Sequence, residues 1–436
     1  MRQGRIEKTV EVGGDKSISH RALMFSALAK GSTKIKNFLT ASDTLVTLGA
    51  LRRLGVRIEK RKEEVIVSST GRLVFGGRYL NMGESGTSMR LLAGILAAAK
   101  VEVILKAAPS LQRRPMSRIT IPLRQMQANI FGRRRNGVEY PPLVIRAVKS
   151  LRAIDYRMPQ ASAQVKSAII FAALKAKGRT YIHQPFISRD HTERMLKVFG
   201  GRIRKKGKLI EVEPSLLKTP QEIFIPADFS SAAYFLALAL LRPKTCLRVK
   251  RVGVNPTRSG LLRVLKRMGA KLRIKNRNSR YFEPYADIEA ESSSLKGVVV
   301  KEEEIPLLID ELPLVFVLAA FASSSSRIYG LRELRVKETD RIHSLECNLK
   351  NMGVEFKVFS YRNRRGEEDF YVEIKGGGFK KFAQIRSFSD HRTAMSMAIG
   401  VGAQGRKVEI DDWHCVGKSF PDFREKIKEI LGPHIF

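Results

Sequence analysis

The sequence has 436 residues, with 80 lysines and arginines against 42 aspartates and glutamates, so its formal net charge is +38. That length predicts two or three domains. Apolar residues make up 43% of the chain, which suffices for a large core and excludes a disordered chain. The three scattered cysteines, Cys246, Cys347 and Cys415, exclude a disulfide framework or a cysteine zinc site and favour a reducing compartment.

The sequence predicts neither a secretory signal nor a membrane span. Its first residues, MRQGRIEKTV, contain no apolar core. The longest apolar runs, at 232–241 and 312–322, reach about half of the ~20 residues that a membrane helix needs. We therefore expect a soluble, cytoplasmic protein. The positive charge leaves two explanations open, a basic solvated surface or polyanionic substrates and partners.

One pattern recurs along the chain at similar intervals. Each copy is an apolar helical stretch that ends near glycine and is followed by an alternating stretch with basic residues. The marker positions lie 69 to 84 residues apart and are Gly55, Gln127, Gly200, Gly269, Gly353 and Gly432. Glycine suits the end of a helix because it enters the left-handed region without a Cβ penalty. The pattern predicts six units of similar length.

The alternating stretches after the markers predict β-hairpins with basic tips. Five such tips hold 21 of the 80 basic residues and lie at 57–62, 133–135, 202–208, 271–280 and 357–365. We interpret these cations as solvated turn residues.

A second kind of helix is expected once in each unit. The six stretches lie at 15–29, 83–99, 162–174, 228–240, 309–322 and 390–403. Each begins with acidic or hydroxyl residues, which are typical of helix N-caps, and then becomes almost wholly apolar, which is typical of a buried helix. Alternating strands and helices predict an α/β or α+β fold. Several such N-termini aimed at one site would favour anions.

The first of these helix starts carries a cation and a hydroxyl close together. Gly14 to Arg21 reads GDKSISHR, which lacks the glycine spacing of a P-loop. Lys16, Ser17 and the backbone N–H groups can nevertheless meet one anion together with Arg21. Taken alone, anion binding and an ordinary helix cap explain this start equally well.

Other helix starts and loops carry similar chemistry. Two glycines in the segment GESGTSMR at 83–90 allow close approach of a ligand to the backbone. Arg113 and Arg114 supply guanidinium groups that match phosphate and carboxylate geometry. Cations alternate with carboxylates over 334–341, Asp390-His391-Arg392 begins the last buried helix, and Lys418 follows it.

Taken together, these motifs resemble the 5-enolpyruvylshikimate-3-phosphate synthase family of enolpyruvyl transferases. The resemblance runs from residue 13 to about residue 423, with the motifs in family order. They are GDKSISHRA, SGTSMR, RRPM, SAQVKSA, SRDHTE, IDELP, RVKETDRI and DHRTAM. Any one of them alone is a weak signal, but the set is highly specific.

The resemblance implies a fold of two domains, each with three strand–helix repeats and buried parallel helices, like an inside-out α/β barrel. Residues 1–14 and 228–436 would form one domain, with the catalytic base and the arginines and lysines on the phosphoenolpyruvate side. Residues 15–227 would form the other, with most contacts to shikimate 3-phosphate. The six units agree with the repeats that we find without the family. A monomer is expected.

The family reaction transfers the enolpyruvyl group of phosphoenolpyruvate to the 5-hydroxyl of shikimate 3-phosphate and releases phosphate. It is an addition–elimination through a tetrahedral intermediate, in the shikimate pathway to chorismate and the aromatic amino acids, and it uses no metal or organic cofactor. The partners would be these two small molecules, without nucleic acid or membrane. Because both carry a phosphate and a carboxylate, several cations are needed; one pair of unit charges ~4 Å apart is worth ~4 kcal/mol at a dielectric of 20.

The resemblance also implies roles for individual residues. Shikimate 3-phosphate would be held by Lys16, Ser17, Arg21, Ser162, Ala163, Gln164, Arg189, Asp310 and Lys337. Phosphoenolpyruvate would be held by Lys16, Gly86, Arg114, Gln164, Arg341, Arg392 and Lys418. Asp310 would deprotonate the attacking hydroxyl, and Glu338, together with Lys16, would deliver a proton to the methylene carbon. For His391 a structural role is favoured over an acid–base one.

The sequence departs from the family pattern at three positions, none of which removes an essential group. Glu84 stands where many members have Asn, Ala163 replaces a Ser, and Glu333 replaces an Asn. Gly86 leaves space where some glyphosate-tolerant relatives have Ala, so the protein is predicted to be sensitive to glyphosate.

Three alternatives compete with this interpretation. The related UDP-N-acetylglucosamine enolpyruvyl transferases usually carry a loop Cys or Asp, and residues 107–118 contain neither. A nucleic-acid-binding repeat protein needs aromatic residues among the basic stretches, and the hairpin tips hold few. A catalytically inactive relative is disfavoured because Lys16, Asp310, Glu338 and Arg341 are all present.

Overall fold

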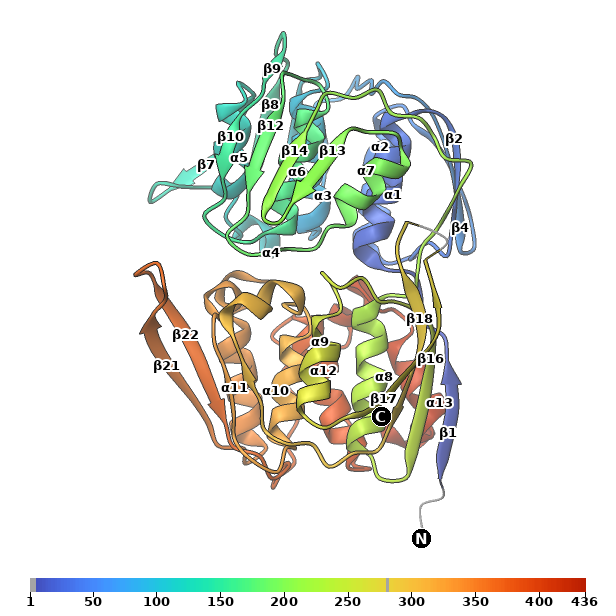
Figure 1. Ribbon diagram of the computed structural model, residues 1–436, viewed down its shortest axis with the longest axis vertical. Coiled ribbons are helices and arrows are strands. Elements are labelled where there is room, and N and C mark those ends of the chain that lie inside the picture. The colour runs from blue at the N-terminus through green and yellow to red at the C-terminus, as the bar shows by residue number, and fades with distance from the viewer. Residues whose placement is uncertain (1–4, 280–281) are drawn as a thin grey trace. The chain divides into compact units, whose positions relative to one another are not determined.

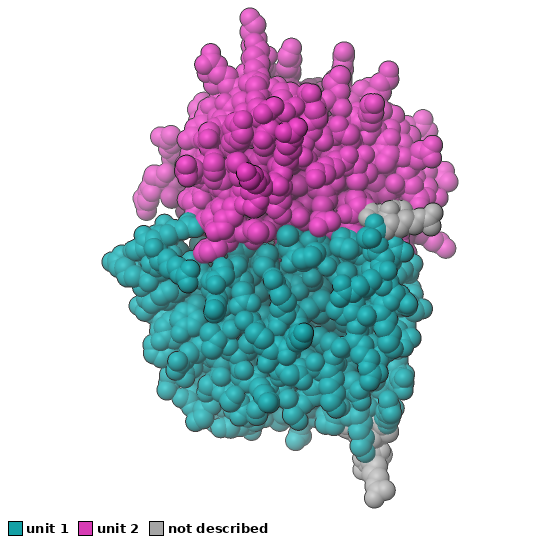
Figure 2. Space-filling model, in the orientation of Figure 1, with its two compact units in different colours: residues 1–13, 226–279, 284–436 teal, residues 14–225, 280–283 magenta. Residues whose placement is uncertain are grey.

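The structure is a computed structural model that describes residues 5–279 and 282–436. The chain divides into two compact units, coloured separately in Figure 2. Unit 1 consists of Met1–Gly13, Pro226–Ser279 and Pro284–Phe436, and unit 2 consists of Gly14–Ile225 and Arg280–Glu283. Each unit is mixed α/β and has a separate apolar core.

Five four-stranded sheets share one pairing scheme, in which the first two strands in spatial order are parallel and the other pairings are antiparallel. Figure 1 shows where the labelled strands lie within each unit. In unit 2 these sheets are β15 (Glu222–Phe224), β2 (Lys30–Lys36), β4 (Glu64–Thr70) and β3 (Arg57–Arg61); β5 (Tyr79–Asn81), β6 (Val103–Lys106), β8 (Val138–Arg146) and β7 (Asn129–Arg135); and β10 (Asp155–Arg157), β12 (Thr180–His183), β14 (Leu209–Val212) and β13 (Ile203–Lys206). In unit 1 they are β1 (Ile6–Val10), β16 (Thr245–Gly253), β18 (Tyr285–Glu291) and β17 (Lys271–Asn278); and β19 (Val299–Val300), β20 (Ser326–Ile328), β22 (Glu368–Ile374) and β21 (Phe356–Arg362).

Smaller strand pairings lie outside these five sheets. Strands β9 (Leu151–Arg152) and β11 (Ala176–Lys177) form a two-stranded sheet in unit 2. In unit 1 an isolated parallel bridge joins Ile385 to Ile410.

The hairpins predicted from alternating sequence are confirmed. Strands β3 and β4, β7 and β8, β13 and β14, β17 and β18, and β21 and β22 pair antiparallel. The interpretation of the basic segments as turn residues is wrong for most of their cations, which lie on the first strand of each hairpin, as Arg133 to Arg135 do on β7. Residue 280, the last of the predicted tip 271–280, lies outside the described residues.

The six predicted buried helices are also confirmed. They are α1 (Lys16–Leu28), α3 (Gly86–Ala97) and α6 (Ala163–Ala173) in unit 2, and α8 (Phe229–Leu241), α10 (Leu312–Ala320) and α12 (His391–Ala403) in unit 1. Side chains cap five of their N-termini by accepting hydrogen bonds from backbone N–H groups. The capping residues are Asp15, Ser85, Ser162, Asp228 and Asp390.

The more exposed helices each end just before one of the markers. They are α2 (Ser42–Arg53), α5 (Ser117–Gln125), α7 (His191–Val198), α9 (Gly260–Arg267), α11 (Arg341–Asn351) and α13 (Phe423–Leu431). All six markers have positive φ, between +67° at Gln127 and +95° at Gly432. The prediction that this position needs the left-handed region is therefore confirmed, even where glutamine occupies it.

Short helical turns make up the remaining elements: α4 (Pro109–Gln112), η1 (Glu302–Leu307), η2 (Arg332–Val336), η3 (His414–Lys418) and η4 (Pro433–Ile435). Among the described residues, no helix combines the length and the apolar character that a membrane crossing requires.

Candidate active site

The candidate residues of unit 2 gather around the N-terminal ends of its three buried helices. Lys16 is the first residue of α1, and its Nζ lies 3.0 Å from the Asp43 Oδ2 of α2. The two side chains are only 17% and 14% exposed, so the carboxylate holds the ammonium group in one place. Sequence reasoning did not identify Asp43, since nothing in the sequence links it to Lys16.

Arg21 is held by three neighbours inside unit 2. Its Nε donates to Thr192 Oγ1 at 2.6 Å and its Nη2 to Ser167 Oγ at 2.9 Å. Its Nη1 donates to the Ser17 carbonyl at 2.9 Å, which brings these two predicted residues together. Burial lowers the pKa of Arg21 to about 10, and the nearby Arg189 acts in the same direction. Arg21 therefore remains a cation at neutral pH and lies close to a second one.

A second group of contacts joins α3 to α6. Arg90 Nη1 donates to Gln164 Oε1 at 2.8 Å, and Gln164 Nε2 donates to Thr87 Oγ1 at 3.0 Å. A Cβ at Gly86 would lie 2.8 Å from an Nη1 atom of both Arg90 and Arg114. Glycine here lets two guanidinium groups approach the backbone closely. Arg90 was not predicted, although it stands in the SGTSMR motif and is buried.

Ser162 and Ala163 begin α6, with the Ser162 hydroxyl accepting a hydrogen bond from Val165 N at 3.3 Å. The loop that carries Arg189 follows β12 and is tied to the same helix by Lys166. The Lys166 Nζ donates to the Ser188 carbonyl at 3.2 Å and lies 2.7 Å from Glu193 Oε1. The residue that precedes Arg189 is thus anchored to α6.

The candidate residues of unit 1 form an ion-pair network around Arg341. Its Nε donates to Asp390 Oδ2 at 2.8 Å, and its Nη2 donates to Glu338 Oε2 at 2.7 Å. Burial opposes the charge, but Asp390, Glu338 and Asp310 raise the pKa of Arg341 above its ordinary value. Asp390 is fully buried, whereas Glu338 is 26% exposed. Glu338 can therefore reach a ligand, whereas the buried Asp390 holds the Arg341 guanidinium group in place.

Arg392 and Asp310 lie beside each other in unit 1. Arg392 Nη2 is 3.9 Å from Asp310 Oδ2. Burial opposes its charge, but Tyr234 and Asp310 raise the pKa of Arg392 above its ordinary value. Asp310 is 24% exposed and Arg392 is 6% exposed. The structure thus places a partly exposed carboxylate next to a buried cation.

A buried polar cluster supports the residue next to Asp310. Arg258 Nη1 donates to Glu311 Oε1 at 2.8 Å. Ser230 contributes short hydrogen bonds to both of these side chains, and Asp228 lies 3.7 Å from Arg258. Sequence reasoning did not identify this cluster, although Asp228 and Ser230 begin one of the predicted buried helices and Glu311 stands in the IDELP motif.

The remaining predicted residues of unit 1 lie on neighbouring segments. Lys337 Nζ is 3.1 Å from Glu333 Oε1, so one of the departures from the family pattern pairs with a candidate lysine. Lys418 Nζ donates to the Ser389 carbonyl at 3.4 Å, next to the Asp390 cap. His391 is buried at the start of α12. No cluster of three or more His, Cys, Asp or Glu side chains in the described ranges could hold a metal ion.

Comparison with known proteins agrees with these motifs. The family model described as EPSP synthase (3-phosphoshikimate 1-carboxyvinyltransferase) matches residues 1–427. The chain belongs to the EPSP synthase family. The resemblance found in the sequence is therefore confirmed, and EPSP is the abbreviation of 5-enolpyruvylshikimate 3-phosphate.

Known members of the EPSP synthase family match this chain over nearly the whole length of both proteins. The 3-phosphoshikimate 1-carboxyvinyltransferases of Petrotoga mobilis and Carboxydothermus hydrogenoformans are both 42% identical, covering 98% and 97% of this chain and 97% and 96% of their own. The structure of EPSP synthase from Acinetobacter baumannii is 39% identical with a TM-score of 0.82, covering 98% of this chain and 96% of that chain. An enolpyruvyl transferase, NikO from Streptomyces tendae, shares the fold at 14% identity with a TM-score of 0.72, covering 98% of this chain and 95% of that chain.

Proposed function

We propose that this chain transfers the enolpyruvyl group of phosphoenolpyruvate to the 5-hydroxyl of shikimate 3-phosphate and releases inorganic phosphate. In the addition step the hydroxyl oxygen bonds to C2 of phosphoenolpyruvate while C3 gains a proton, which gives a tetrahedral intermediate. In the elimination step C3 loses a proton and the bond from C2 to the phosphate oxygen breaks. The observation that carries this proposal is the family match over residues 1–427.

The unit 2 residues are proposed to hold most of shikimate 3-phosphate. Ser17, Arg21 and Arg189 would bind its anionic groups, because two close cations and a hydroxyl match a phosphate. Lys16 would reach both substrates from the start of α1. Ser162, Ala163 and Gln164 would complete the contacts at the N-terminus of α6, where free N–H groups favour an anion. Their fixed hydrogen bonds support the assignment, since preorganised groups lose little freedom on binding.

Phosphoenolpyruvate is proposed to be held by the residues that the family resemblance assigns to it, which are Lys16, Gly86, Arg114, Gln164, Arg341, Arg392 and Lys418. The close approach of two guanidinium groups to Gly86 supports this assignment. A larger side chain at Gly86 would displace these two guanidinium groups. The sensitivity to glyphosate that we expect from the space at Gly86 is still a prediction.

Catalysis is proposed to use Asp310 as the base that orients and deprotonates the hydroxyl, with Lys337 nearby. Glu338 and Lys16 are the proposed sources of the proton that C3 receives. The different surroundings of Asp310 and Glu338 support separate roles, because neighbouring charge and burial set which carboxyl group holds a proton. Arg341 and Arg392 would stabilise the charge that develops on the leaving phosphate.

The finer organisation is also a proposal. We propose that the two units correspond to two domains of three repeats each, divided near residues 14 and 228, with the reduced pairing at Ile385 and Ile410 as the sixth repeat. The common pairing scheme of the five four-stranded sheets supports this. A cytoplasmic monomer that binds neither nucleic acid nor membranes is part of the same proposal.

Phosphorus NMR of the protein mixed with phosphoenolpyruvate and shikimate 3-phosphate tests the reaction. The expected result is the joint loss of both substrate signals and the appearance of inorganic phosphate and one new phosphomonoester. Phosphate that appears without the second product would indicate hydrolysis and would contradict the proposal.

A further inference from the structure

A cavity of about 930 Å³ lies in unit 2 where its three buried helices end. Leu28 is the last residue of α1, and Ala98 and Leu174 are the C-caps of α3 and α6. The candidate active-site residues lie at the opposite ends of these helices, and none of them lines this cavity. The cavity is therefore separate from the site described above.

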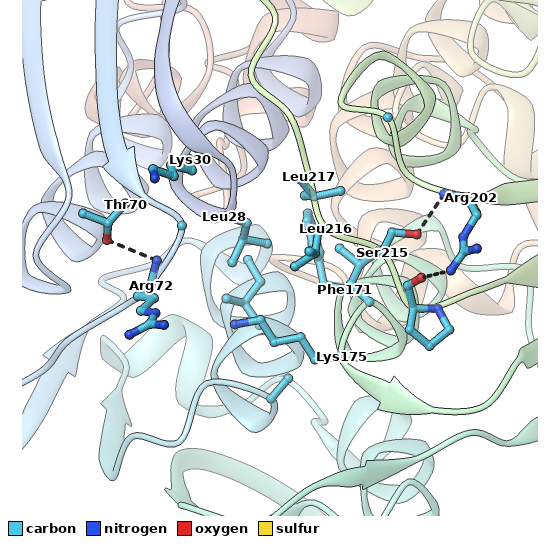
Figure 3. A pocket seen from close by; sticks show the side chains of 16 residues that line it. Leu28, Lys30, Thr70, Arg72, Phe171, Lys175, Arg202, Ser215, Leu216 and Leu217 are labelled. Carbon is cyan, nitrogen blue, oxygen red and sulfur yellow. Dashed lines mark hydrogen bonds between the residues drawn. The ribbon is translucent and has the colours of Figure 1, made fainter.

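The walls of the cavity are largely apolar. Leu28, Ile95, Phe171, Leu174 and Leu217 line it, and Figure 3 shows Leu28, Phe171 and Leu217 together with the adjoining Leu216. Leu216 is 95% exposed, so an apolar ligand in the cavity would cover it. The volume falls in the range of about 300 to 1,000 Å³ that is typical of small-molecule sites.

The rim of the cavity is basic and holds no carboxylate. Lys30, Arg72, Lys175 and Arg202 line it, and no Asp or Glu does. Arg202 is occupied, since its Nε lies 3.2 Å from Glu213 and its Nη2 donates to the Pro214 carbonyl. Within residues 5–279 and 282–436, no side chain or carbonyl pairs with the side-chain nitrogens of Lys30, Arg72 and Lys175.

Two of these cations lie close together. Figure 3 shows the Lys175 side chain extending beneath Leu28 toward Arg72. Burial lowers the pKa of Lys175, and the charges of Arg72 and Lys100 lower it further. Lys30, Arg72 and Lys175 are exposed to solvent and no acidic side chain lines the cavity beside them, so an anion would meet unopposed positive charge there.

The three cations do not serve as hydrogen-bonding caps for the helices that end beneath them. Backbone N–H groups bond one carbonyl at the end of each helix: Ala29 N bonds Phe25 O, Ala98 N bonds Ile95 O, and Ser215 N bonds Leu174 O, at 3.1 to 3.2 Å. The helix dipoles still favour cations at these ends, but no hydrogen bond within the described residues fixes the three side chains, which leaves them available to a ligand.

We propose that this cavity binds a monocarboxylate with an unbranched acyl chain. The chain would lie against Leu28, Leu174 and Leu217, and the carboxylate would lie between Arg72 and Lys175. An anion with several charges and no apolar body would leave the leucine walls exposed, whereas a neutral lipid would leave the cations unpaired. This inference does not depend on the proposed enzymatic function.

Calorimetric titration of the full-length protein tests the proposal, with decanoate below its micelle concentration and 1-decanol as the neutral counterpart. We expect decanoate to bind about tenfold more tightly than decanol, or better, because charge-assisted hydrogen bonds distinguish the two. The double variant Arg72→Gln/Lys175→Gln should remove that preference. The control Arg133→Gln/Arg135→Gln removes two exposed cations from the β7 end and should keep it.

A second variant keeps the net charge. Ala98→Phe places a ring in the cavity and should abolish binding of both compounds, with thermal unfolding checking that the variant folds. Equal affinity for decanoate and decanol in the unmodified protein would overturn the proposal. So would the absence of decanoate binding at millimolar concentration, equal loss in the control variant, or binding only to vesicles of anionic phospholipid.

Discussion

The two carboxylates that pair with Arg341 differ in their surroundings, and on that difference we propose different roles for them. Asp390 is buried and caps α12, whereas Glu338 is partly exposed. Removing the charge of Glu338 keeps the shape of the side chain and its hydrogen bond to Arg341, but it removes an ionisable proton donor. We expect Glu338→Gln to lower kcat by about 10²- to 10⁴-fold, the usual contribution of general acid–base catalysis.

A matched substitution on α11 provides the control for this effect. Glu346 pairs with the exposed Lys350, and Glu346→Gln should leave kcat unchanged in steady-state assays of phosphate release. Full turnover by Glu338→Gln would remove Glu338 from the mechanism.

Lys166 illustrates a residue that acts by positioning others. Its side chain is fully buried and lies 2.7 Å from Glu193. Replacing one member of such a pair leaves an unpaired buried charge, so we expect Lys166→Met to lower the free energy of unfolding by about 3–5 kcal/mol in urea. Because Lys166 holds the carbonyl of Ser188, the KM for shikimate 3-phosphate should rise more than kcat falls.

Two further variants separate a role of Lys166 in positioning the loop from a general loss of stability. The exposed Lys177→Met should leave both the free energy of unfolding and the KM unchanged. The double variant Lys166→Met/Glu193→Leu should recover stability without restoring the KM, because the loop anchor is still absent. An unchanged KM in Lys166→Met would show that the anchor has no part in substrate binding.

Three helices of unit 2 are linked by a chain of buried polar groups that begins at His20. His20 Nδ1 lies 2.7 Å from Thr47 Oγ1, and Thr47 Oγ1 lies 2.7 Å from Ser88 Oγ. Burial lowers the pKa of His20 well below its ordinary value, and Lys16 and Arg21 lower it further. The folded protein therefore keeps this histidine neutral at pH values where the unfolded chain, with a histidine pKa of about 6.5, takes up a proton.

Because the unfolded state binds the extra proton, stability should fall as the pH drops below about 6.5, with this residue adding up to about 1.4 kcal/mol per pH unit to the slope. Urea unfolding between pH 7 and pH 5 should show a shallower decline for His20→Asn. The exposed His434→Asn serves as the control and should keep the original slope. Equal slopes for His20→Asn and the unmodified protein would contradict this account.

At the scale of helices and strands, the sequence predicts the features that depend on neighbouring residues. Caps such as Asp15, the buried helices and the left-handed markers depend on residues within a few positions, so periodicity and composition reveal them. Pairings such as Lys16 with Asp43, or Arg90 with Gln164, join segments 27 and 74 residues apart. No local pattern specifies such pairs, because they depend on how the helices pack. The family resemblance supplied the candidate residues, and the structure supplied the groups that hold them.

At the scale of the whole molecule, the charge of +38 has two different parts. Cations of the hairpins often pair with carboxylates, as Arg57 and Arg61 do with Glu59, and Arg273 and Lys275 with Glu289. Candidate-site cations also pair with carboxylates, as Lys16 does with Asp43 and Arg341 with Asp390, but their side chains are much less exposed than those of the hairpin cations.

We therefore expect no specific or salt-resistant binding to nucleic acid. A gel-shift titration with duplex DNA and single-stranded RNA at physiological ionic strength should show free nucleic acid at micromolar protein, although complexes should form at low salt. A retained shift at physiological salt would show that the basic surface has a nucleic-acid partner.

The central claim is that this chain is a metal-independent enolpyruvyl transferase for shikimate 3-phosphate. Its most direct test is the initial rate of phosphate release, measured by a coupled assay with each substrate alone and with both together, before and after treatment with EDTA. The account predicts phosphate release only when phosphoenolpyruvate and shikimate 3-phosphate are both present, at a rate that EDTA leaves unchanged. Absence of phosphate release with both substrates at every tested pH and temperature would contradict it.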